Sequence, residues 1–81
     1  MKNSLYISES NIKSIATELN KIDKVNISFD SNIDDKSLHT AVKIISELEN
    51  NSSILVIYDI KTLSFDVKKR VVKAFLTNDN F

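Results

Sequence analysis

The segment that decides the fold spans residues 33–58 and reads IDDKSLHTAVKIISELENNSSILVIY. It opens on two acids, continues with apolar residues at helical spacing, and ends in an unbroken apolar run. The apolar positions of its first part are Leu38, Ala41, Val42, Ile45 and Leu48. This spacing places them on one face of a helix that Asp34 or Asp35 caps. The segment therefore predicts a helix, a polar turn and a strand at Ile54–Tyr58.

Upstream of this segment, Val25, Ile27 and Phe29 alternate with polar residues, which is typical of a strand with one buried face. Leu5–Ile7 is a shorter strand candidate. Between the two strands, Ser8 or Ser10 is expected to cap a helix. The apolar positions of that helix are Ile12, Ile15, Ala16, Leu19 and Ile22.

Downstream, Ser64 is expected to cap a third helix. Its apolar positions are Val67, Val71, Val72, Phe75 and Leu76. The order β-α-β-α-β-α predicts one small α/β domain over residues 1–81, with a largely parallel sheet and right-handed crossovers. Because Ile54–Tyr58 is apolar at every position, we expect it to be a central strand covered on both faces.

The composition excludes several functional classes. Eleven basic residues balance eleven acidic ones, so no overall charge attracts the chain to nucleic acid. With no cysteine, disulfides and thiolate metal sites are excluded. The longest apolar run, Ile54–Tyr58, is far shorter than the roughly 20 residues of a membrane span, and no signal peptide is evident. We therefore expect a cytoplasmic protein that does not insert into membranes.

Glycine and proline are both absent. Without glycine, the chain cannot form the glycine-rich loops that hold nucleotide phosphates. The turns are expected to use asparagine and aspartate in left-handed conformations. The candidate positions are Asn32, Asn50–Asn51 and Asn78–Asn80.

The order of elements and two of its motifs resemble the STAS domain of anti-sigma factor antagonists and some transporter-associated proteins. Members have a strand followed by an Asp-Ser-Ser-Gly-Leu-like turn at a helix start, where this chain has Val25–Asp30 and then Ile33–Leu38. A later apolar strand and a helix opening on a Val-Lys-Arg-like segment are similar to Ile54–Ile60 and Val67–Arg70. In this chain Ser37 replaces the glycine of the motif. The resemblance covers residues 5–81 and implies a STAS-like sheet with helices packed on it.

The resemblance also implies a regulatory protein-binding domain that is not an enzyme and uses no cofactor or metal. Its partner would be a serine kinase-like anti-sigma factor or an ABC transporter subunit, bound at the start of the second helix. The residues carried over are Asn32, Ile33, Asp34, Asp35, Ser37, Leu38 and His39. In phospho-switch members a serine occupies the position of Asp35, so Asp35 is the equivalent of the phosphorylation site.

Three readings of Asp35 follow. It mimics the phosphorylated state by a permanent charge, or it marks a member that binds constitutively. Alternatively, Asp34 and Asp35 only cap a helix.

Other functions remain open. Asp34, Asp35 and Asp59 resemble the acidic cluster with which a receiver domain holds Mg²⁺. A small inhibitor protein of phage or plasmid type fits the compact, neutral chain equally well. An unpaired strand edge would also favour a homodimer.

The last helix offers a further choice. Its basic residues form either the solvated side of the helix or a docking strip for an acidic partner. They are Lys68–Arg70 and Lys73. The aromatic residues near it are predicted to pack in the core or against the C-terminus: Phe65, Phe75 and Phe81.

Overall fold

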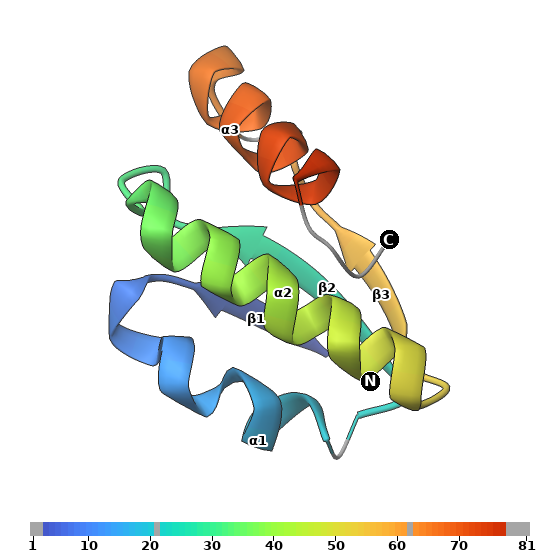
Figure 1. The fold of residues 1–81 in the computed structure, drawn as a ribbon. Helices are drawn as coiled ribbons and strands as arrows, with labels where there is room; N and C mark the ends of the chain where they lie inside the picture. The colour runs from blue at the N-terminus through green and yellow to red at the C-terminus, as the bar shows by residue number, and fades with distance from the viewer. Residues whose placement is uncertain (1–2, 21, 62, 78–81) are drawn as a thin grey trace.

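The computed structural model describes residues 3–20, 22–61 and 63–77 (Figure 1). The prediction for Asn78–Asn80 and for Phe81 therefore lies outside the described residues. The elements are, in chain order, β1 (Ser4–Ile7), the 3-10 helix η1 (Glu9–Ser14), α1 (Ile15–Leu19), β2 (Lys24–Phe29), α2 (Asp35–Asn51), β3 (Leu55–Tyr58) and α3 (Phe65–Leu76). This order confirms the predicted alternation of strands and helices.

The strands form a three-stranded sheet in the order β1-β2-β3, and both pairings are parallel. In its register, Leu5 lies beside Ile27, and Ile27 lies beside Tyr58. Because the spatial order follows the chain order, right-handed crossovers place α1 and α2 on the same face of the sheet. Figure 1 shows α2 lying across the sheet between α1 and α3. The protein is thus a two-layer α/β domain.

The core lies between the sheet and these helices. From β2 it receives Val25, Ile27 and Phe29, each with an exposed fraction of 3% or less. The apolar side of α2 contributes four more buried residues, Leu38, Ala41, Val42 and Ile45. Tyr58 closes the core toward α3, with its ring stacked on Phe29 at 6.2 Å and edge-to-face with Phe75 at 4.7 Å between centroids. The alternation in β2 and the helical spacing in α2 therefore both identified core residues.

The prediction that the third strand is central was wrong. β2 is the central strand because it pairs on both sides, whereas β3 pairs with β2 alone. Val56 and Tyr58 face the helices, while Leu55 and Ile57 are exposed on the opposite side of the sheet. Tyr6 of β1 is exposed as well. An apolar run matches a strand covered on both faces, but the described residues supply helices for one face only.

The predicted first helix forms in two parts, η1 and the five-residue α1, and ends before Ile22. Polar residues in its first turns bond to nearby backbone and so compete with α-helical hydrogen bonding. Asn11 Oδ1 accepts a hydrogen bond from Ser8 N at 2.9 Å, and Ser14 Oγ donates one to Asn11 O at 3.0 Å. Ala16, predicted on the apolar face, is exposed.

The prediction of left-handed turns was also wrong for the positions that the structure describes. None of residues 3–20, 22–61 and 63–77 has a positive φ angle, which includes Asn32 and Asn50–Asn51. Side chains close the turns instead. After β2, Asp30 Oδ1 accepts a hydrogen bond from Asn32 N at 3.2 Å, and after β3, Asp59 Oδ1 accepts one from Lys61 N at 3.3 Å.

Candidate functional site

The residues predicted to bind a partner lie in the turn after β2 and in the first turn of α2. Asn32, Asp34, Asp35 and His39 are exposed, and Ser37 is half-buried. Two members of the set, Ile33 and Leu38, are instead fully buried core residues. The exposed members could therefore contact a partner directly, whereas Ile33 and Leu38 hold the turn against the core.

Asp34 is the N-cap of α2, which is one of the two positions that the sequence predicts for the cap. Its Oδ2 accepts a hydrogen bond from Ser37 N at 3.3 Å. Hydrogen bonding from Ser37, followed by an interaction with Glu9, lowers the pKa of the Asp34 carboxyl group. The carboxylate form is favoured because it satisfies an otherwise unpaired N–H group at the helix start.

Asp35 joins α2 to α3. Its Oδ1 accepts a hydrogen bond from Arg70 Nε at 2.6 Å, and the two side chains form an ion pair. Arg70 also donates a hydrogen bond from its terminal nitrogen to the backbone carbonyl of Ile33. Arg70 therefore fixes both the carboxylate and the backbone of the turn. The Asp35 side chain is still 73% exposed, so its charge faces the solvent.

A second contact joins the same two helices. His39 Nδ1 lies 3.4 Å from Thr77 Oγ1, at the end of α3. The Thr77 hydroxyl also bonds to the Lys73 carbonyl at 2.9 Å. Asp35 and His39 are four residues apart in α2, so they lie on the same side of the helix. The structure connects both residues to α3.

Sequence reasoning missed a group of polar side chains beside Asp34, consisting of Tyr6, Glu9 and Asp30. Hydrogen bonding and charge repulsion from Asp34 raise the pKa of Glu9. Partial desolvation, followed by a hydrogen bond with Asp30, raises the pKa of the exposed Tyr6 side chain. A signal existed in the sequence, because residues that follow neighbouring parallel strands meet at the carboxyl edge of the sheet.

The three carboxylates proposed for a receiver-like Mg²⁺ site each make a separate structural contact. Asp34 caps α2, Asp35 pairs with Arg70, and Asp59 closes a turn. Within residues 3–20, 22–61 and 63–77, no three His, Cys, Asp or Glu side chains are grouped so that they could hold a metal ion. The receiver-like alternative thus gains no support from the part of the chain that the structure describes.

No protein-family model, curated protein or solved structure matches this chain. The resemblance to STAS domains therefore remains a prediction from the sequence motifs. In the described residues, no helix has the length and apolar character needed to cross a membrane.

Proposed function

We propose that this chain is a non-enzymatic, protein-binding regulatory module of STAS-like type that binds its partner through the start of α2. The supporting observation is the arrangement of Asp35, whose exposed carboxylate is held in one position by Arg70. The same arginine ties down the backbone at Ile33. Although Arg70 pairs with it, 73% of the Asp35 side chain is exposed, so a partner can reach its charge.

The proposed partner is a serine kinase-like anti-sigma factor or an ABC transporter subunit. In this proposal Asp35 supplies the charge that phosphorylation supplies in switching STAS domains. The dipole of α2 stabilises such a charge by about 0.3–1 kcal/mol. Both partner classes act in or at the cytoplasm, so the proposal places the protein there.

Arg70 competes with the partner for Asp35, and this competition gives the test. Asp35→Asn removes the charge and breaks the ion pair, whereas Arg70→Met breaks the same pair and leaves the charge free. We expect Arg70→Met to bind the partner at least as well as the wild type, and Asp35→Asn to bind it weakly. If the pair has only a structural role, the two variants will behave alike.

The experiment is a pull-down from extracts of the native cells with immobilised wild type, Asp35→Asn and Arg70→Met, read by mass spectrometry. Recovery of one kinase or transporter subunit by the wild type and by Arg70→Met alone supports the proposal. Equal recovery by all three reduces the acidic turn to a helix cap. If none recovers a partner of these classes, the STAS resemblance has no functional content.

A homodimer through a strand edge belongs to the same proposal. β1 and β3 each pair with β2 alone, so each has one edge without a neighbouring strand in the described sheet. Such edges present backbone donors and acceptors to another strand. Light scattering over a range of protein concentrations tests this, and a constant monomer mass at the highest concentration would contradict it.

A further inference from the structure

Helix α3 is apolar on two opposite sides. One side packs into the domain through Val67, Val71 and Ala74, all buried. On the other side, Phe65 is 74% exposed, Val72 49% and Leu76 80%. At 3.6 residues per turn these three positions fall within about 40° of one another and span about 16 Å. A helix with apolar residues on both sides is expected to be covered on both.

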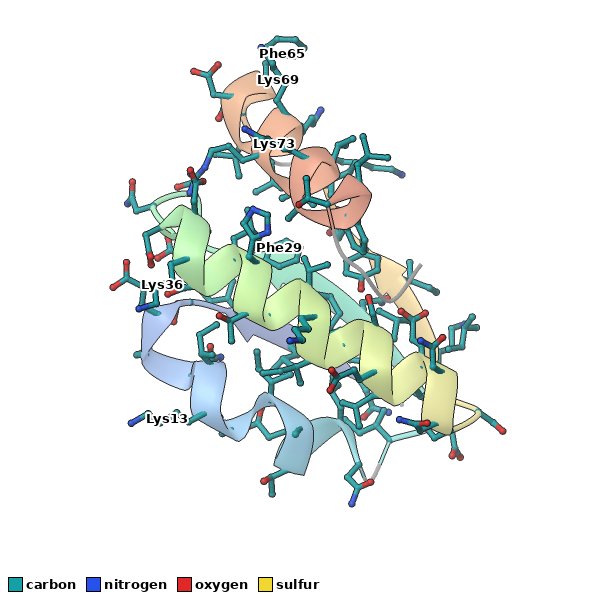
Figure 2. The ribbon with its side chains drawn as sticks, viewed as in Figure 1. Lys13, Phe29, Lys36, Phe65, Lys69 and Lys73 are labelled. Carbon is teal, nitrogen blue, oxygen red and sulfur yellow. The ribbon has the colours of Figure 1, made fainter. Side chains whose placement is uncertain are left out.

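This outer stripe, defined as Phe65, Val72 and Leu76, lies beside a row of lysines. Lys69 Nζ is 5.4 Å from the centroid of the Phe65 ring. With Lys68 and Lys73 it lines a hollow along the stripe. Figure 2 shows Phe65 and Lys69 at the end of α3 that projects from the domain. Arg70 and one acid, Asp66, line the same hollow, so the stripe is apolar along its centre and mainly basic at its margins.

We propose that the outer stripe of α3 docks an acidic amphipathic helix of another protein. Lys69 and Lys73 are four residues apart, so two carboxylates one turn apart on a facing helix can pair with both. The apolar side of that helix covers Val72 and fills the hollow between Phe65 and Leu76. This surface is separate from the Asp35 turn, and the inference goes beyond the function proposed above.

Charge and shape favour this occupant over two others. A second copy that docked stripe to stripe would bring the same lysines together, which repels. A membrane surface is a poorer match because the chain has no net charge and the apolar stripe is narrow. Membrane-bound helices bury a broad apolar face, whereas the opposite side of α3 is already occupied by the core of the domain.

The probe is a synthetic helical peptide of about 18 residues, five turns long, with a leucine stripe flanked by glutamates. The control peptide has lysine in place of every glutamate. Each is titrated into the full ¹⁵N-labelled chain, and chemical shifts are followed by NMR. The glutamate peptide is expected to shift the amides around Phe65, Lys69, Val72, Lys73 and Leu76, and added salt to weaken its binding.

Variants then test the two components of the surface. Lys69→Glu with Lys73→Glu, and separately Leu76→Ser, should each weaken peptide binding by about tenfold. The charge control is Lys13→Glu, on η1 at the opposite side of the molecule (Figure 2), which should leave binding unchanged. Since all of these side chains are exposed, the melting temperature should stay the same, which separates lost binding from lost folding.

Four results would overturn the proposal. The first is that the lysine peptide binds as well as the glutamate peptide, and the second is that the glutamate peptide causes no chemical-shift changes in α3. The third is that the protein binds phosphatidylserine vesicles but not the peptide. The fourth is that the chemical shifts of α3 change with protein concentration in the absence of peptide. The third would indicate a membrane and the fourth a second copy. Binding by Asp35→Asn at wild-type affinity would show that the α3 surface acts independently of the turn.

Discussion

Helices α2 and α3 lie side by side in one layer, yet they distribute their apolar residues differently. α2 buries Leu38, Ala41, Val42 and Ile45 along one side and carries polar residues on the other. α3 fully buries only Val67, Val71 and Ala74, keeps Phe75 half-buried against Tyr58, and exposes Phe65, Val72 and Leu76. Apolar side chains stabilise the fold only where they are removed from water. We infer that α2 supplies stability, while α3 is attached weakly and offers a surface.

Truncating the same residue type in each helix should show this difference in stability most clearly. Leu38→Ala in α2 removes a side chain that is 0% exposed and should cost about 2–5 kcal/mol in free energy of unfolding. Leu76→Ala in α3, where the side chain is 80% exposed, should change it by less than about 0.5 kcal/mol. Urea denaturation followed by circular dichroism measures both. Comparable losses would refute the assigned roles of the two helices.

The N-caps give a second matched pair. Asp34 and Ser64 each accept a hydrogen bond from a backbone N–H group in the first turn of their helix. Replacing either with alanine should cost about 0.5–2 kcal/mol. Asp34→Ala should cost more at neutral pH because Asp34 also places a charge at the positive end of the α2 dipole.

The pH dependence of the Asp34→Ala effect follows from its pKa. The folded-state pKa of Asp34 lies below its ordinary value of 3.8, so its contribution is complete above pH 3.8. The contribution should disappear as the pH falls through the lowered pKa. Thermal melts between neutral and acidic pH measure this, with Ser64→Ala as the uncharged control. A gap between wild type and Asp34→Ala that stays constant down to the lowest pH would contradict the assignment.

Cutting the contact between the helices should have a smaller, local effect. Arg70→Met removes a partly exposed ion pair worth about 1 kcal/mol or less, together with the bond to the Ile33 carbonyl. Hydrogen exchange should become faster in α3 and stay unchanged in the buried part of α2, because local opening follows the weakest attachment. If the amides of both helices accelerated together, α3 would be an inseparable part of the core.

The smallest effect is expected at Glu9. Its folded-state pKa is raised above 4.5, so it stabilises the fold below that pH and loses this contribution as the pH rises through the raised value. Glu9→Gln, which keeps a neutral group beside Asp34, should remove this loss. The variant should gain stability relative to wild type across that window, as measured by melting temperature. An identical pH profile for both proteins would exclude the interaction with Asp34.

Local patterns predicted most of the secondary structure because they depend on neighbouring residues. The alternation in β2, the apolar face of α2 and the caps at Asp34 and Ser64 were all identified in this way. The position of β3 in the sheet was not, since an apolar run does not show which face is covered. Phe65 was likewise predicted to be a packed residue and is exposed.

The candidate site was predicted less completely, for a related reason. The turn and its exposed acids follow from local sequence. The contact between Asp35 and Arg70 joins residues 35 positions apart, and no periodic pattern connects them. The contact between His39 and Thr77 joins residues 38 positions apart and likewise follows no periodic pattern. These contacts depend on how α3 packs beside α2. They connect the exposed acidic turn of α2 to a second helix.

The uniformly negative φ angles of the described residues have a consequence for the unfolded chain. A glycine at a position with negative φ would add conformational freedom to that state without relieving any strain in the fold. A chain of average composition and this length would carry about six glycines, and each replacement at a compatible position stabilises by about 0.4–1 kcal/mol. The glycine-free chain therefore has fewer conformations available in its unfolded state. Less conformational entropy is then lost when this chain of 81 residues folds around a core that lies on one face of the sheet.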